Sequence, residues 1–239
     1  MLHVNHIHFS YGRVPILRDI TFDVAPGEIL AVVGANGAGK TTLLKMLATL
    51  LIPAAGEIHL DAVSLFQAPL RYRHLIGYIS EHGPLYPEMT VEAYLIHRAQ
   101  LKGERHLRIR RRVADLISQC DLQSVRQQRI RTLSYGYAKR IGIADALITH
   151  PSLLLLDDPL ANLDEVTRRL VAATLTAASS RSSIILTGHG IREMMEWCTR
   201  IAVLHKGTLV GIHRTSEYTT ADLHKLITTE MSTGLEFQP

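Results

Sequence analysis

The residues best suited to chemistry in this 239-residue chain are a lysine and a threonine that end a glycine-rich loop. Residues 34–41 read GANGAGKT and fit the pattern G-x-x-x-x-G-K-[ST]. An apolar run typical of a buried strand precedes the loop, and helix-forming residues follow it. Glycines let the backbone turn tightly, so that N–H groups and the positive end of the helix can face phosphate oxygens. The loop therefore predicts a phosphate site in which Lys40 contacts phosphate and Thr41 contacts Mg²⁺.

Two adjacent carboxylates follow a second apolar run. Residues 153–156 are four leucines, and Asp157 and Asp158 come directly after them. A phosphate loop of this kind is served by an acid on a neighbouring strand, which holds Mg²⁺ directly or through water. We predict that Asp157 has this role; the alternative is that it only caps the following helix.

The composition sets broad limits. Hydrophobic residues make up 46% and charged residues 20%, as in ordinary globular proteins. The net charge of +4 suits phosphate ligands, anionic lipid or nucleic acid and does not choose among them. Cys120 and Cys198 are far apart and outside any C-x-x-C pattern, which favours a reducing cytoplasm over a disulfide framework or a zinc site. We expect no secretory signal, because the first residues lack a basic segment followed by an apolar one. We expect no membrane span, because no apolar run approaches ~20 residues.

The elements that must position these residues read as an α/β core with an inserted helical lobe. We expect one domain over 1–239, with the core from 1–81 and 151–213, the helical subdomain from 82–150 and a short C-terminal tail from 214–239. The last ~25 residues are expected to form one short helix and a loose tail. Strands are predicted at 4–10, 20–24, 28–34, 57–60, 76–80, 153–156 and 183–187, with a hairpin at 201–205 and 208–213. Helices are predicted at 41–51, after an N-cap at Thr90, and at 108–119 and 138–149.

The chain also carries several motifs in a fixed order, and together they resemble the nucleotide-binding subunit of ATP-binding cassette (ABC) transporters. The resemblance covers residues 2–213. It implies an α/β fold: a P-loop NTPase core with a small antiparallel β subdomain and an inserted α-helical subdomain. It rests on GANGAGKTT at 34–42, LSYGYAKR at 133–140, LLLLDDP at 153–159, LANLD at 160–164 and TGHG at 187–190. The stretch from IGYIS to VEAYL, at 76–95, resembles the exporter subgroup. The N-K-x-D motif of GTPases is missing from the sequence.

The resemblance implies roles for individual residues. Tyr11 would stack on adenine, and Asp164 would communicate across a dimer. His189 would contact the γ-phosphate and help to position the attacking water. Ser134 and Gly136 would contact ATP held by a second cassette. The implied phosphate contacts are Asn36, Gly37, Ala38, Gly39, Lys40, Thr41 and Thr42, and the implied Mg²⁺ contacts are Thr41, Glu81 and Asp157.

The sequence departs from the family pattern at three places. Glu81 stands where a glutamine is usual, and Tyr135 and Tyr137 replace the first glycine and the glutamine of the signature LSGGQ. Asp158 stands where the family has the catalytic glutamate, so its carboxylate is one methylene closer to the backbone. Because a general base must come within ~3 Å of its proton, we hypothesise that hydrolysis is slow while ATP binding is retained. The alternative is that the local backbone compensates and the rate is normal.

These features favour the ATP-hydrolysing subunit of a membrane transporter, with a lean to export, at the cytoplasmic face of the cell membrane. ATP and Mg²⁺ are the expected cofactors. The expected partners are membrane-spanning subunits and a second cassette, identical or related; nucleic acid is not expected. Two alternatives remain: a cassette ATPase acting on ribosomes or DNA, and an ATP-gated clamp without turnover.

One further signal stays open. The run RHLRIRRR at 105–112 carries five arginines in the predicted helical subdomain. It fits a solvent-exposed helix face, a surface near anionic lipid, or a nucleic-acid contact.

Overall fold

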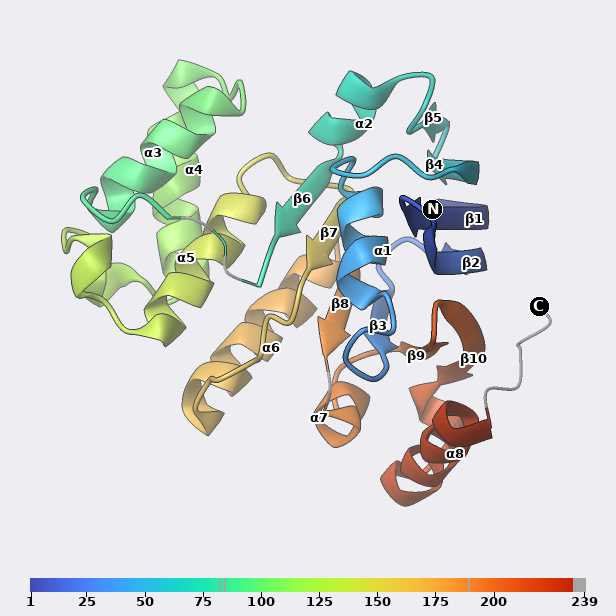
Figure 1. Ribbon diagram of the computed structural model, residues 1–239. Coiled ribbons are helices and arrows are strands. Elements are labelled where there is room, and N and C mark those ends of the chain that lie inside the picture. Colours follow the sequence, from blue (N-terminus) through green and yellow to red (C-terminus); the bar gives the residue numbers. More distant parts are fainter. Residues whose placement is uncertain (82, 84, 189, 234–239) are drawn as a thin grey trace.

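The all-leucine strand β7 (Leu153–Leu156) is buried over its whole length, and it lies inside a six-stranded sheet. The computed structural model describes residues 1–81, 83, 85–188 and 190–233 (Figure 1). The strand order is β10-β9-β3-β8-β7-β6. The other members are β3 (Ile29–Val33), β6 (Ile76–Ile79), β8 (Ser183–Gly188), β9 (Arg200–His205) and β10 (Thr208–Arg214). All neighbours pair in parallel except β9 and β10, which form the predicted hairpin.

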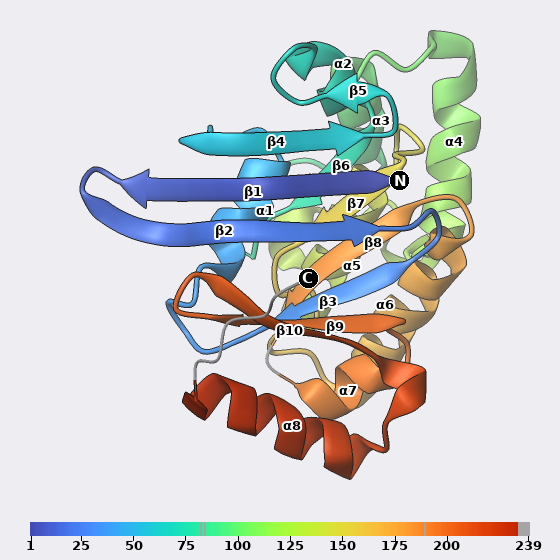
Figure 2. The ribbon, with the colours of Figure 1, turned by 90° about the vertical axis from the view of Figure 1, so that its right-hand side faces the viewer.

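A second sheet is antiparallel and has the order β2-β1-β4-β5. Its strands are β1 (Leu2–Tyr11), β2 (Val14–Val24), β4 (Ala55–Leu60) and β5 (Val63–Ser64). Figure 2 shows this sheet lying across the strands of the six-stranded sheet, with α1 behind it. The predicted strand at 20–24 was too short, because β2 pairs with β1 from Val14 onward. The short strand β5 was not predicted.

The helical part of the chain forms a separate lobe beside the sheets (Figure 1). It contains α3 (Val91–Leu101), α4 (His106–Gln119) and α5 (Tyr135–Ala146), with 3₁₀ turns at Gln123–Val125 and Ile130–Thr132. The predicted N-cap is confirmed, because the Thr90 side chain accepts a hydrogen bond from the Ala93 N–H. The predicted starts at 108 and 138 were wrong by two and three residues, since α4 begins at His106 and α5 at Tyr135.

The remaining helices surround the six-stranded sheet. They are α1 (Lys40–Leu47), α2 (Pro69–His74), α6 (Glu165–Ser179), α7 (Ile191–Met195) and α8 (Thr220–Thr233), with a 3₁₀ turn at Thr215–Glu217. The short helix expected in the C-terminal segment is confirmed as α8, which extends to Thr233 and buries Leu223 and Ile227 completely. Helices α2, α6 and α7 were not predicted.

Helix α1 ends at Leu47, whereas the sequence suggested Leu51. Thr49 takes the left-handed conformation, with φ of 62°. The N–H groups of Thr49 and Leu50 then donate to the carbonyls of Met46 and Lys45, which satisfies the last turn of the helix. Glycine is the usual residue at such a position, so a threonine there does not indicate the end of a helix.

Buried side chains form two clusters, one on each face of the six-stranded sheet. One joins the sheet to α6 and the helical lobe; the other joins it to α1 and the antiparallel sheet. Because β3, β7 and β8 are adjacent and parallel, their carboxyl ends meet at one edge, where parallel sheets of this kind bind ligands. Among the described residues, no helix combines the length and the apolar character that crossing a bilayer requires.

Candidate functional site

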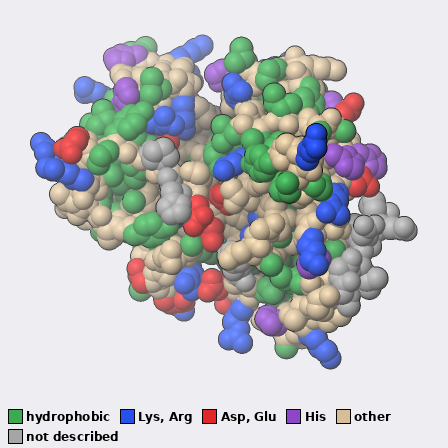
Figure 3. Space-filling model, in the orientation of Figure 1, with side chains coloured by type: hydrophobic (Ala, Val, Ile, Leu, Met, Phe, Trp, Pro, Cys, Tyr) green, Lys and Arg blue, Asp and Glu red, His purple; other side chains and the backbone are tan. Residues whose placement is uncertain are grey.

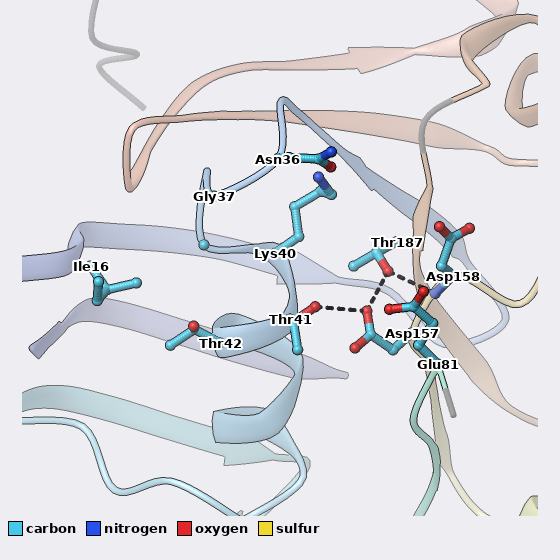
Figure 4. A pocket seen from close by; sticks show the side chains of 11 residues that line it. Ile16, Asn36, Gly37, Lys40, Thr41, Thr42, Glu81, Asp157, Asp158 and Thr187 are labelled. Carbon is cyan, nitrogen blue, oxygen red and sulfur yellow. Dashed lines mark hydrogen bonds between the residues drawn. The ribbon is translucent and has the colours of Figure 1, made fainter. Parts of the chain in front are cut away.

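A cavity of about 580 Å³ lies at this edge of the sheet, between the loop after β3 and the aspartates after β7. Figure 4 shows its side chains converging from α1, β8 and the ends of β6 and β7. Most of the residues predicted for phosphate and Mg²⁺ therefore gather at one place. The lining consists of Ile16, Asn36, Gly37, Gly39, Lys40, Thr41, Thr42, Glu81, Asp157, Asp158 and Thr187.

The loop after β3 holds an almost buried ammonium group. Gly39 precedes α1 with φ of 108°, a conformation that side-chain-bearing residues rarely adopt. Lys40 follows it, and its Nζ donates to the carbonyls of Gly34 at 2.7 Å and Ala35 at 3.0 Å. Burial lowers the pKa of Lys40, while the carboxylates of Asp158 and Asp157 act in the opposite direction. A phosphate beside this ammonium would supply the negative charge that offsets its burial.

Asp157 accepts hydrogen bonds from two threonines on different elements. Thr41 Oγ1 donates to Asp157 Oδ1 at 3.1 Å, and Thr187 Oγ1 donates to the same oxygen at 2.8 Å (Figure 4). Asp157 is 4% exposed and Thr187 is 1% exposed. This pairing of a carboxylate with a hydroxyl, beside a phosphate loop, is the oxygen-ligand chemistry that suits Mg²⁺. The donor set therefore fits the metal that the sequence suggested.

Asp158 has an unusual backbone conformation. Its φ is 45°, in the left-handed region, which aspartate tolerates better than most residues. The Asp158 N–H donates to Thr187 Oγ1 at 2.9 Å. In Figure 4 the Asp158 carboxylate points away from that of Asp157. Thr187 thus contacts both aspartates. Asp158, whose side chain is shorter than the glutamate of the family pattern, has a strained backbone conformation.

Lys139, on α5, ties the helical lobe to the site. Its side chain is buried, and Nζ donates to the carbonyls of Glu81 at 2.8 Å and Asp158 at 3.2 Å. The ammonium also lies 5.4 Å from the centre of the Tyr135 ring. One side chain therefore connects the start of α5 with the loops after β6 and β7.

Sequence reasoning assigned no role to Ile16, Lys139 or Thr187. Lys139 and Thr187 lie inside the motifs at 133–140 and 187–190, so the motifs could have directed attention to them. Ile16 lies on β2 and reaches the cavity only through the packing of that strand.

Several other predicted residues that the structure describes do not line the cavity, among them Tyr11, Ser134 and Gly136. Tyr11 is 49% exposed, and its ring packs edge-on against Phe9 at 4.8 Å. Ser134 and Gly136 lie at the start of α5, where the Ser134 side chain is exposed and makes no capping hydrogen bond. His189 lies outside the described residues.

Ala38 is buried below the loop and does not line the cavity. Its N–H donates to the Ala35 carbonyl at 3.2 Å, and its own carbonyl accepts from the Gly207 N–H at 3.0 Å. The Gly207 carbonyl accepts in turn from the Arg18 N–H at 2.8 Å. The turn between β9 and β10 is therefore hydrogen-bonded to the phosphate loop and helps to hold its backbone in place.

Asp164 caps α6 and does not line the cavity. The N–H and hydroxyl of Thr167 donate to its carboxylate at 2.9 and 2.7 Å, and these hydrogen bonds lower the pKa of Asp164. Gly136 approaches the same place, because a Cβ at this position would lie 2.9 Å from Thr167 Cγ2. The start of α5 thus packs directly on the first turn of α6.

Comparison with known proteins assigns this arrangement to a family. The family model described as "ABC transporter" matches residues 17–161, more than half of the chain. The chain belongs to the ABC transporter family. This cassette contains the loop and both aspartates within the matched region, whereas Thr187 and His189 follow it.

Some curated relatives of the cassette are named as import proteins and others as export proteins. The spermidine/putrescine import ATP-binding protein PotA of Legionella pneumophila (strain Lens) is 30% identical over 228 residues, which are 94% of this chain and 62% of PotA. The Nod factor export ATP-binding protein I of Paraburkholderia xenovorans is 33% identical over 203 residues, covering 84% of this chain and 67% of that protein. The chain therefore spans about three-fifths of PotA, and the relatives do not assign a direction.

A solved structure confirms the fold. The structure titled as the ATP-binding subunit of an ABC transporter superposes with a TM-score of 0.85 at 26% identity, over 95% of this chain and 99% of that one. The prediction of a nucleotide-binding cassette is therefore confirmed, whereas the exporter subgroup remains a prediction.

Proposed function

We propose that this cassette is the ATP-hydrolysing subunit of a membrane transporter. The observation that carries the proposal is the convergence of Lys40, Thr41 and Asp157 on one cavity at the carboxyl edge of the sheet. Lys40 and the N–H groups of the loop would bind the β- and γ-phosphates of ATP. Thr41, Asp157 and Glu81 would hold Mg²⁺, which when bound neutralises charge on the phosphates.

The proposed general base is Asp158, assisted by His189. Asp158 would accept a proton from the attacking water, which requires its carboxylate to reach that water directly or through one other. The left-handed backbone and the hydrogen bond that the Asp158 N–H donates to Thr187 Oγ1 fix where the short side chain begins. Since a displacement of about 1 Å can cost on the order of 100-fold in rate, we propose that hydrolysis is slower than with glutamate.

Steady-state ATP hydrolysis by the wild type, Asp158→Glu and Asp158→Asn tests this role. We expect the glutamate variant to be about tenfold faster, because it restores the missing methylene, and the asparagine variant to be inactive. All three should bind ATP, measured as a shift in thermal unfolding. An Asp158→Asn variant as fast as the wild type would show that Asp158 is not the base.

Asp61 provides a matched control for the backbone. It also has a positive φ, of 53°, and it does not line the cavity. Asp61→Glu and Asp61→Asn should leave the rate of hydrolysis unchanged. If the wild type and the Asp158→Glu variant both bind ATP and neither hydrolyses it, an ATP-gated clamp is favoured over a transport ATPase.

A second cassette would complete the site. Ser134 and Gly136 do not line the cavity of their own chain, and Ser134 is exposed at the start of a helix. A hydroxyl and N–H groups at a helix start are suited to an anion on another molecule. We therefore propose that two cassettes associate head to tail, each presenting this turn to the ATP of its partner.

The groove between α1 and the helical lobe offers a surface for a membrane-spanning subunit. It has a volume of about 510 Å³ and is lined in part by Leu50, Tyr78, Tyr86 and Arg98. Leu50 is exposed, and the buried Tyr78 hydroxyl has no hydrogen-bond partner within the described chain. We propose that a segment of the membrane subunit with both apolar and polar side chains docks here. This contact would hold the cassette at the cytoplasmic face of the membrane.

For the direction of transport we propose export, on the basis of the stretch at 76–95. The decisive measurement is ATP-dependent cargo movement in vesicles that contain the cassette and its membrane subunit, with the cassette on a known side. Accumulation on the side opposite the cassette is the expected result.

A further inference from the structure

The most exposed large hydrophobic side chain of the described residues lies in the first turn of α4, next to the connection from α3. Leu107 is 97% exposed, and Leu101, on the other side of this connection, is 61% exposed. We refer to residues 101–111 as the α3–α4 tip. It lies at the same end of the molecule as α2 in both ribbon views (Figures 1 and 2). Two exposed leucines that flank one short connection suggest a partner that covers them.

The arginine run of this region divides into two groups. Arg112 belongs to the fold, because its Nε donates to the Ile148 carbonyl at 3.0 Å and its guanidinium also contacts the Leu147 carbonyl, at the end of α5. The others have exposed side chains that form no ion pair within the described part of the chain; these are Arg105, Arg108, Arg110 and Arg111. Glu104 is the one acid of the tip. The tip is therefore a cluster of available positive charge.

The helical period places Leu107 and two of the arginines on one face of α4. Helix α4 buries Ile109, Val113, Leu116 and Ile117 against the lobe. At 100° per residue, Leu107 and Arg111 fall on the opposite side, and Arg108 lies beside them. Figure 3 shows Lys, Arg and His side chains along the upper edge of this lobe, with hydrophobic side chains between them.

We propose that the α3–α4 tip binds the surface of an anionic lipid bilayer. Leu107 enters the boundary between headgroups and acyl chains, while Arg105, Arg108 and Arg111 contact lipid phosphates. This inference rests on the proposed function, which brings the cassette to a membrane. It adds a direct contact with lipid, separate from the groove that receives the membrane subunit.

Two observations favour lipid over nucleic acid. Single strands of nucleic acid are bound by aromatic side chains on which bases stack, and the tip has leucines and no Phe, Tyr or Trp. The tip also continues from the proposed docking groove: Arg98 lines the groove, and Leu101 lies one turn further along α3. A membrane subunit in the groove would thus bring the tip near the headgroups.

Binding of the full chain to vesicles tests the proposal. The probes are vesicles of phosphatidylcholine alone and vesicles of phosphatidylcholine and phosphatidylglycerol in equal parts, with bound protein measured by flotation. We expect binding to the anionic vesicles only, and weaker binding as salt is raised. Replacing Arg105, Arg108 and Arg111 by Gln together should reduce the affinity roughly 100-fold, at about fivefold for each charge near the surface. Leu107→Gln should reduce it about tenfold, through lost apolar burial.

Matched controls lie elsewhere on the surface. Arg13, Arg169 and Arg181 are also exposed, so their joint replacement by Gln removes the same charge away from the tip. Val166, 70% exposed on α6, is the control for Leu107. Both control variants should bind anionic vesicles like the wild type, and all variants should hydrolyse ATP at the wild-type rate.

Three results would overturn the inference. These are no binding to anionic vesicles, equal losses in the tip and control variants, and binding of a single-stranded RNA probe that depends on the tip while vesicle binding does not. Each would leave the proposed function intact, because ATP hydrolysis by the cassette is measured without vesicles. Absence of ATP hydrolysis by the wild-type chain would instead contradict the proposed function.

Discussion

Thr187 uses one hydroxyl to fix two neighbouring acids. Its Oγ1 donates to Asp157 and accepts from the Asp158 N–H, and the residue lies on β8, between the strands that carry the phosphate loop and the aspartates. No part of the threonine needs to touch ATP for this. It acts by holding the positions from which a metal ligand and a base would work.

We expect Thr187→Val to reduce kcat about 10- to 100-fold, because the backbone of Asp158 loses its anchor. The buried N–H left without an acceptor should also cost about 1–3 kcal/mol of stability. Steady-state kinetics and chemical denaturation measure the two effects. Thr174→Val is the control: Thr174 is also buried and bonded to carbonyls, but on α6 away from the cavity, so kcat should not change.

Lys139 is a positioning residue of a different kind, because it joins two loops through their carbonyls. We expect Lys139→Met to lower kcat about tenfold and to change the Mg²⁺ concentration needed for half-maximal rate, since Glu81 and Asp158 are no longer held together. Lys139→Arg should restore part of the rate. A Met variant with an unchanged Mg²⁺ dependence and kcat would contradict the role.

The control for this lysine is Lys102. It is also largely enclosed, and it pairs with Asp145 at 3.0 Å inside the helical lobe. Lys102→Met removes a comparable buried ammonium far from the loops. It should lower thermal stability without changing the Mg²⁺ dependence of hydrolysis.

At the scale of elements, the contact between α5 and α6 depends on a residue without a side chain. Gly136→Ala would place a Cβ 2.9 Å from Thr167 Cγ2, so one helix must move. We expect a loss of about 1–2 kcal/mol in the free energy of unfolding, since the overlap outweighs the better helix propensity of alanine.

A second substitution checks the cause of that loss. Thr167→Ser removes Cγ2 and keeps the hydroxyl that bonds to Asp164, so Gly136→Ala combined with Thr167→Ser should recover most of the stability. Additive losses in the double variant would show that the overlap is not responsible. Urea denaturation of the four proteins gives the coupling energy.

Some elements of the fold could be predicted from the sequence and others could not. The loop at 34–41 and the leucine strand were predicted because their signals are local: a motif and a continuous apolar run. Helix α6 also had a local signal, with Asp164 as N-cap and Val171, Thr174, Leu175 and Ala178 at helical spacing, and could have been found. The stop of α1 at a left-handed threonine could not, because threonine rarely takes that conformation.

In the candidate site, too, some residues could be predicted from the sequence and others could not. Lys40, Thr41 and Asp157 were predicted from their motifs, and the structure brings them to one cavity. The contacts of Thr187 and Lys139 depend on the strand order β3-β8-β7 and on how α5 packs against it. That arrangement involves residues far apart in sequence, so no local pattern contains it.

For the whole molecule, the exposed start of α5 predicts a dimer that depends on ATP. We expect Asp158→Asn, with hydrolysis removed, to accumulate as a dimer in Mg-ATP and to remain a monomer without nucleotide. Adding Ser134→Glu should prevent the dimer by placing a negative charge against the partner's phosphates, while ATP binding by the monomer continues. Size-exclusion chromatography with light scattering measures the mass. Dimers that persist with Ser134→Glu would rule out the head-to-tail arrangement.

The turn between β9 and β10 has a consequence for the order of events during synthesis. The phosphate loop rests on Gly207, which follows Ala38 by 169 residues, since 207 − 38 = 169, and Gly207 also receives the N–H of Arg18. The loop motif therefore leaves the ribosome long before its support does. During that interval the nascent chain has the residues that bind nucleotide but lacks the backbone contact that shapes them. Competence to bind ATP should arise late in translation, when the hairpin joins three distant parts of the chain.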